Sequence, residues 1–130
     1  MWNFIFDSAP KKVRGADKKA VWGPRHWAFL HQIAACYPET YVHAKHAQEN
    51  RRTYNFLKVY YCMMIPCKQC RTSYGDYMSK HDTELKKALA SGSVMLQTFM
   101  YDLHNYVNDK LGKASGPPFH EVLTTYNCRD

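Results

Sequence analysis

The chain has 130 residues, enough for one domain with a single hydrophobic core. Apolar residues make up 45% of it, which excludes an intrinsically disordered chain, and no apolar run is long enough to span a membrane. The formal net charge of +7 favours anionic partners such as nucleic acid, acidic proteins or a phosphorylated cofactor, although a solvated basic surface explains it equally well.

The chain divides by composition into an arm, one domain and a short tail. Residues 1–20 are polar and basic beyond the first six, which predicts a flexible arm with no secretory signal. Residues 21–127 are expected to form the domain, and residues 128–130 a tail. Helical periodicity dominates the domain and strand signals are weak.

The predicted helices are taken in chain order, with Pro24 in the first turn of the first one. A loop is expected over residues 40–48, and Pro38, Pro66 and Gly112 mark helix ends. The predicted spans are Pro24–Tyr37, Glu49–Met64, Cys67–Lys80, a short piece at Thr83–Ala90, Ser93–Leu111 and a last short helix at 118–126. The sequence therefore predicts an all-α bundle of four main helices with short links.

Cys67-Lys68-Gln69-Cys70 directly follows Pro66, at a predicted helix start. The N–H groups and the positive dipole end of a helix stabilise a thiolate there, which favours a redox-active pair. Zinc is the alternative, because one CxxC supplies two of the four ligands of a structural site, and His81 or His104 could supply others. No second CxxC lies at a suitable spacing.

Polar residues also gather on the predicted fourth helix, where Tyr101, His104, Asn108 and Leu111 share one face. Its His, Asn and Lys side chains could bind and neutralise an anionic ligand, but each residue alone is better explained by a solvated face or a core histidine. Trp27 and His31, four residues apart, likewise fit a packed core pair.

Three stretches together resemble the Erv/ALR family of FAD-linked sulfhydryl oxidases. Trp22-Gly23-Pro24-Arg25-His26-Trp27-Ala28-Phe29-Leu30-His31, continuing to Tyr37-Pro38, is similar to the family's WGxxxWxxLHxxAxxYP opening. Pro66-Cys67-Lys68-Gln69-Cys70 is similar to its PCxxC, and the stretch from His104 to Lys113 to its HNxVNxKLGK. The stretches occur in the family's order and at similar spacing, over about residues 22–126.

The resemblance implies a four-helix bundle with a short fifth helix, holding FAD at the mouth of the bundle, and a homodimer. Trp27 and His31 would then pack around the cofactor, and Tyr126 would stack on the adenine where the family often has Trp. The full set of implied cofactor contacts is Gly23, Arg25, Trp27, His31, Tyr101, His104, Asn105, Val107, Asn108, Lys110, Leu111, Lys113 and Tyr126.

The implied activity is the formation of disulfides in protein substrates. A substrate dithiol attacks the Cys67–Cys70 disulfide and leaves oxidised. The resemblance assigns Cys67 to the incoming thiol and Cys70 to the flavin, which passes electrons to oxygen to give hydrogen peroxide. The basic charge would help hold the FAD pyrophosphate and attract acidic substrates. A zinc- or nucleic-acid-binding module using the CxxC is the alternative; it explains the charge but not the accompanying motifs.

The remaining cysteines depart from the family pattern. Many relatives carry a second, structural disulfide, but its two positions here hold Tyr101 and the Phe119-His120-Glu121 stretch, so this disulfide is expected to be absent. Cys36 and Cys62 have apolar helical neighbours and are interpreted as inert buried thiols. Cys128, in the tail, is expected to be accessory: a shuttle, a bridge between subunits or a lone thiol.

The compartment and the natural substrate are not encoded in any motif. Compact, signal-free family members occur in large DNA viruses, which would place the protein in the host cytoplasm or the virion. The mitochondrial intermembrane space is the alternative.

Overall fold

The structure is a computed structural model that describes residues 18–128. All of its regular elements in this range are helical, which confirms the all-α class. The predicted arm lies outside the described residues except for its last three positions, which form the start of the first helix. The elements are α1 (Lys18–Ala35), α2 (His43–Asn55), the π-helical segment η2 (Phe56–Tyr60), α3 (Tyr61–Met64), α4 (Lys68–Lys80), α5 (Asp82–Ser91), α6 (Ser93–Lys110) and α7 (Phe119–Thr125).

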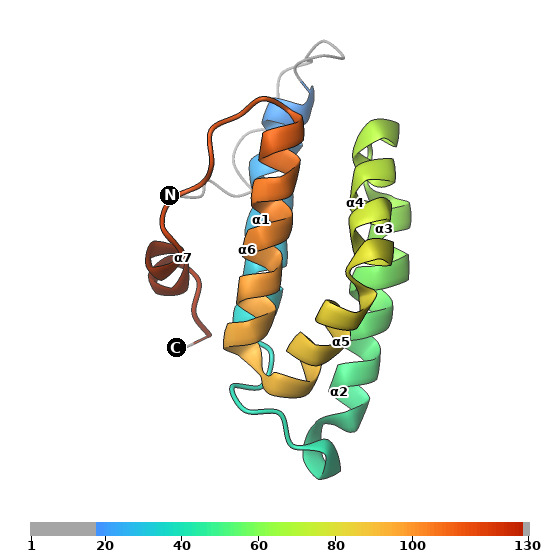
Figure 1. Cartoon of the computed structure of the whole chain (residues 1–130), viewed down its shortest axis with the longest axis vertical. Coiled ribbons are helices and arrows are strands. Elements are labelled where there is room, and N and C mark those ends of the chain that lie inside the picture. Colours follow the sequence, from blue (N-terminus) through green and yellow to red (C-terminus); the bar gives the residue numbers. More distant parts are fainter. Residues whose placement is uncertain (1–17, 129–130) are drawn as a thin grey trace, which may run out of the picture.

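The helices form two pairs joined by a short helix (Figure 1). α1 packs along α6, and the continuous stretch α2–η2–α3 lies beside α4. α5 links α4 to α6 and contacts both, while α7 packs against α6 on its outer side. The C-terminal part of α6 and the start of α4 therefore lie at the same end of the bundle as the N-terminal part of α1.

The core fills the space between these helices. Its fully buried side chains come from α1, η2, α4, α5 and α6, and the largest are Tyr74, Leu30, Leu57, Met78, Leu85, Leu89, Leu96, Met100 and Leu103. Buried Tyr hydroxyls are satisfied by backbone carbonyls: Tyr74 donates to Leu57 O and Tyr37 to Leu89 O, each at 2.6 Å. The core thus fixes α4 against the π-helical segment, and α1 against α5.

α1 begins six residues before the predicted start, so Pro24 lies inside the helix rather than in its first turn. Proline removes one backbone donor and crowds the carbonyls of the preceding turn. The Arg25 guanidinium donates to one of them, the Val21 carbonyl, at 2.7 Å. This side-chain donor supports the helical turn before Pro24, which the sequence pattern had left outside the helix.

α2 also begins earlier than expected, at His43 within the predicted loop 40–48. This helix start has an unusual cap. The backbone N–H groups at a helix start have no partner within the helix, and here the Val42 N–H donates to the His46 ring Nδ1 at 2.9 Å. The imidazole thereby performs the role that Glu or Gln plays in a capping box.

The junction between α5 and α6 depends on a glycine. Gly92 has φ +145°, and a Cβ there would lie 2.2 Å from the Glu39 carbonyl oxygen. The close approach lets Ser93 N–H donate to Pro38 O at 2.9 Å and Tyr41 N–H to Ser91 O at 3.1 Å. The loop after α1 is therefore held directly against this junction.

Candidate functional site

A cavity of about 550 Å³ opens between the N-terminal part of α1, the start of α4 and the C-terminal half of α6. Its volume lies in the range of ligand pockets, and aromatic and apolar side chains dominate its lining. Nine residues predicted from the sequence line it: Gly23, Trp27, Cys70, His104, Val107, Asn108, Leu111, Lys113 and Tyr126. The structure thus brings the three sequence motifs together around one space.

The CxxC pair stands at the edge of this cavity. Cys67 is the N-cap of α4, and its Sγ accepts a hydrogen bond from the Cys70 N–H at 3.3 Å. A donated N–H and the positive end of the helix dipole both favour negative charge on that sulfur. Cys70 lines the cavity, whereas Cys67 does not, and both are partly accessible. The two sulfurs therefore face different surroundings, as the predicted division of roles requires.

A row of flat rings forms one wall of the site. The Trp27 and His104 rings are nearly parallel, with centroids 4.0 Å apart and an interplanar angle of 6°. His104 Nδ1 and His31 Nε2 share a hydrogen bond at 2.9 Å, and the His31 ring stacks on Tyr126 at 5.0 Å. Residues from α1, α6 and the segment after α7 thus combine into one aromatic surface.

The histidines of this wall are held neutral. Burial lowers the pKa of His31 from 6.5 to about 4. Burial, reinforced by His31, His26 and Lys113, lowers the pKa of His104 to about 3. The buried His31 Nδ1 has no hydrogen-bond partner among the described residues. A buried ring nitrogen without a partner is uncommon in folded proteins, because burial removes the water that would satisfy it.

Sequence reasoning missed one polar group in the cavity, His26. Its Nδ1 shares a short hydrogen bond with the Tyr61 hydroxyl, and the two rings stack with centroids 5.4 Å apart. Burial, with His31 nearby, lowers the pKa of His26 to about 4. The sequence signal for His26 was its spacing, because residues four apart lie on the same face of a helix and His26 follows Trp22 by four. In the structure, both side chains line the cavity. Pro24, Ile65 and Tyr74 complete the lining and were not predicted as site residues.

Five predicted cofactor contacts lie outside this lining, and one of them, His31, is buried behind the aromatic wall. Arg25 binds the Val21 carbonyl, as described above. The Tyr101 hydroxyl donates to Pro117 O at 2.6 Å, and Asn105 Oδ1 accepts from the Gly116 N–H at 2.9 Å. These two side chains fix the segment after α6, which carries Lys113. Lys110 lines a smaller cavity of about 250 Å³ that also includes Cys70.

The structure corrects the interpretation of two cysteines. Cys36 and Cys128 form a disulfide within the chain, so Cys36 is neither buried nor a thiol, and Cys128 is neither a lone thiol nor a bridge between subunits. Cys36 lies just beyond the end of α1, where the apolar helical pattern no longer implies burial. Cys62 is a partly buried thiol whose pKa is raised by burial, which disfavours a nucleophilic role.

Among residues 18–128, no group of three or more His, Cys, Asp or Glu side chains could hold a metal ion. Within the same part of the chain, no helix combines the length and apolar character needed to cross a membrane.

The fold defines a class of all-helical bundle already known from solved structures. The yeast Erv1 core superposes with a TM-score of 0.70 at 22% identity, covering 96% of each chain. The model of the Erv1 / Alr family matches residues 24–127, and the chain belongs to this family.

Two similar proteins are named as FAD-linked sulfhydryl oxidases. The chain is 32% identical over 92 residues to "Probable FAD-linked sulfhydryl oxidase R368" of Acanthamoeba polyphaga mimivirus. It is 26% identical over 106 residues to "FAD-linked sulfhydryl oxidase ERV1" of Arabidopsis thaliana. These matches cover 71% and 82% of this chain, but only 59% and 50% of the two relatives.

Proposed function

We propose that this protein is an FAD-linked sulfhydryl oxidase that forms disulfides in protein substrates and reduces oxygen to hydrogen peroxide. The observation that carries the proposal is that Cys70 of the CxxC pair and the Trp27–His104 stack line one cavity. Electron transfer from sulfur to a flavin needs a dithiol next to a surface on which the flat flavin ring can stack, and this cavity combines the two. The names of the relatives support the same activity.

The chemistry of the lining suits FAD. Flat rings at Trp27 and His104 offer stacking surface, and Asn108 and Lys113 offer a hydrogen-bonding amide and a cation for an anionic pyrophosphate. The neutral state of His104 avoids placing a buried cation in the aromatic stack. We therefore propose Gly23, Trp27, His104, Val107, Asn108, Leu111, Lys113 and Tyr126 as direct contacts, with His31 supporting the stack from behind.

The first half of the reaction needs only the chain's own sulfurs. A substrate thiolate attacks Cys67 Sγ of the Cys67–Cys70 disulfide, which breaks the S–S bond and leaves a Cys70 thiolate and a mixed disulfide. The second substrate thiol displaces Cys67, giving an oxidised substrate and a reduced CxxC pair. Cys67 suits the attacked position because its sulfur, once displaced, accepts the Cys70 N–H.

The second half returns the pair to the disulfide. When bound, FAD accepts the two electrons of the dithiol and delivers them with two protons to oxygen. Cys70 presents its sulfur to the cavity, and the aromatic wall excludes water from this side. Cys67 then closes the bond with Cys70 on the first turn of α4.

The partners follow from this activity. We propose thiol-containing proteins and oxygen as substrates, and a homodimer as the assembly. The exposed apolar side chains Val59, Tyr60, Met63 and Met64 offer an interface on η2 and α3. The viral relative supports a host-cytoplasmic or virion setting.

The proposal is tested by the visible absorption spectrum of the purified protein under air exclusion. Flavin bands should bleach on addition of dithiothreitol and return with oxygen. Cys70→Ser should keep the bands and abolish bleaching, while Cys62→Ser, the matched thiol outside the cavity, should behave like wild type. A protein that resists reconstitution with FAD, or a Cys70→Ser variant that still bleaches at the wild-type rate, would refute the proposal.

A further inference from the structure

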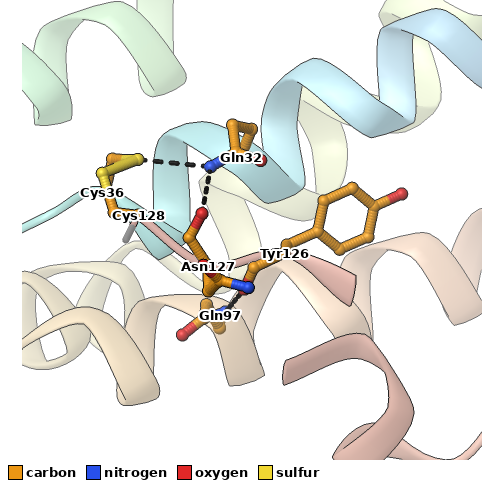
Figure 2. The surroundings of a disulfide bond; sticks show 6 residues. All are labelled: Gln32, Cys36, Gln97, Tyr126, Asn127 and Cys128. Atoms are coloured by element: carbon orange, nitrogen blue, oxygen red, sulfur yellow. Dashed lines mark hydrogen bonds between the residues drawn. A yellow bond between two sulfur atoms is a disulfide. The ribbon is translucent and has the colours of Figure 1, made fainter. Parts of the chain in front are cut away.

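The Cys36–Cys128 disulfide joins two ends that are 92 residues apart in sequence. Cys36 directly follows α1 and lies five residues after His31. Cys128 lies two residues after Tyr126, and Figure 2 shows both cysteines beside Tyr126 and Asn127. The bond therefore ties the segment after α7 to the helix that carries the aromatic wall. Both cysteines are exposed.

Side-chain hydrogen bonds from α1 and α6 also reach the segment that the disulfide holds. Gln32 Nε2 donates to the Asn127 carbonyl at 2.9 Å and lies 3.2 Å from Cys36 Sγ (Figure 2). Gln97 Nε2 donates to the Tyr126 carbonyl at 3.3 Å. Hydrogen bonds near the surface exchange readily with water, so each contributes little net stability. The covalent bond is a stronger restraint than either of these two hydrogen bonds.

Tyr126 connects the Cys36–Cys128 disulfide to the large cavity, because it lies two residues before Cys128 and lines the cavity. Its backbone is extended beyond the end of α7, its ring stacks on His31 at 5.0 Å, and it lines the large cavity. Tyr126 also borders the surface hollow that contains Cys128. Holding residue 128 against the end of α1 therefore holds the Tyr126 ring against His31.

We propose that the Cys36–Cys128 disulfide is a positioning strap that keeps Tyr126 in place as one wall of the cofactor cavity, so that its reduction weakens FAD binding. This inference rests on the proposed function. It gives the disulfide a role in retaining the cofactor, distinct from electron transfer.

An electron-shuttle role does not fit the geometry. The cavity that includes Cys70 also includes Trp22 and Gly23, near the start of α1. The helix axis rises about 20 Å from there to the end of α1 beside Cys36. The strap and the CxxC pair therefore lie at different ends of the bundle.

The expected effect is a weaker FAD complex in an otherwise folded protein. Without the bond, binding must order the Tyr126 side chain and its flanking backbone, which should raise the dissociation constant about tenfold. The measurement is FAD titration followed by flavin fluorescence on wild type, Cys36→Ser and Cys128→Ser. Cys62→Ser is the control, and circular dichroism checks the helical content of each variant.

A double-mutant cycle identifies the route of the effect. In a Tyr126→Ala background, Cys36→Ser should change the dissociation constant by less than about twofold, because the strap then has no ring to position. In a Cys67→Ser, Cys70→Ser background, a water-soluble phosphine should reproduce the loss of affinity by reducing the Cys36–Cys128 bond to two thiols. This reduction experiment keeps Cys36 and Cys128 unsubstituted, so it tests the proposal even if Cys36→Ser folds poorly.

The possible outcomes separate this inference from the proposed function. Unchanged affinity in both strap variants and after reduction would overturn the strap while leaving the oxidase proposal intact. If Cys36→Ser weakened FAD binding equally in the wild-type and Tyr126→Ala backgrounds, the strap proposal would also be overturned. The disulfide would then act through the general stability of the fold and not through the Tyr126 ring. A wild-type protein that binds no FAD would overturn the proposed function and this inference together.

Discussion

His31 links the three parts of the aromatic wall. It hydrogen-bonds His104, stacks on Tyr126 and lies one turn from Trp27 on α1. The sequence allowed two interpretations, a packed core histidine or a cofactor contact, and the structure contains features of both. The side chain is 3% exposed and does not line the cavity, yet it orders the rings that do.

Burial of these histidines makes stability depend on pH. The folded protein holds His31 neutral with its pKa lowered from 6.5 to about 4, so the unfolded chain binds more protons between those values. The free energy of unfolding should have its full value above pH 6.5 and should decrease as the pH drops toward 4. At about 1.4 kcal/mol per pKa unit, His31 alone accounts for a loss on the order of 3 kcal/mol.

Urea unfolding of the FAD-free protein between about pH 7.5 and about pH 4.5 checks this expectation. His31→Gln should flatten the decline, because one of the groups that gains a proton on unfolding is removed. His120→Gln, an exposed imidazole on α7, controls for the loss of a histidine as such. Equal slopes in wild type and His31→Gln would contradict the argument.

At the scale of helices, the sequence was most informative where packing and local chemistry agree. The periodic apolar pattern predicted α6 almost to the residue, and the Pro66–Cys67 boundary correctly placed the CxxC at a helix start. The sequence pattern failed where an unusual side chain supplied the helix cap, as His46 in the first turn of α2 does by accepting the Val42 N–H. The π-helical turn at Phe56–Tyr60 could not be predicted, because its register depends on contacts such as that of Tyr74 with Leu57 O.

Gly92 provides a test at the same scale. An alanine Cβ would meet the Glu39 carbonyl oxygen at 2.2 Å and would require φ +145°, which side chains disfavour. Gly92→Ala should therefore destabilise the protein by about 2 kcal/mol or more, measured by thermal or urea unfolding.

Gly23→Ala is the matched control, because it lies within α1 and a Cβ there meets nothing within 4 Å. This substitution should stabilise the helix by about 0.5–1 kcal/mol. Stability changes of the same sign in the two variants would show that the close approach at Gly92 is not the cause.

For the whole molecule, the sequence predicted which residues converge but not every bond that holds them. Nine predicted residues line one cavity, because the ordered motifs fall on helices that meet at one end of the bundle. The Cys36–Cys128 bond was missed, because five cysteines do not reveal their connectivity and 92 residues separate this pair. The packing of α7 against α6 brings Cys128 to the end of α1, which is a tertiary contact that the sequence does not display.

The proposed homodimer is tested through its exposed apolar side chains. Met63 is 70% exposed on α3, close to the other apolar residues of that surface. Met63→Lys should shift sedimentation velocity profiles from dimer toward monomer, because a buried unpaired charge is costly at an interface. Met95→Lys, an exposed methionine on α6, is the control, and equal behaviour of the two variants would reject this interface.

The net charge of +7 leads to a prediction about substrates. A basic molecule attracts acidic partners over distances that salt shortens, so kcat/KM for an acidic peptide dithiol should fall as ionic strength rises. At saturating FAD, turnover of uncharged dithiothreitol should stay constant over the same salt range, which separates substrate attraction from cofactor retention. If acidic and basic peptide dithiols responded identically to salt, the charge would have no part in substrate choice, and selectivity would depend on the local surface around Cys67.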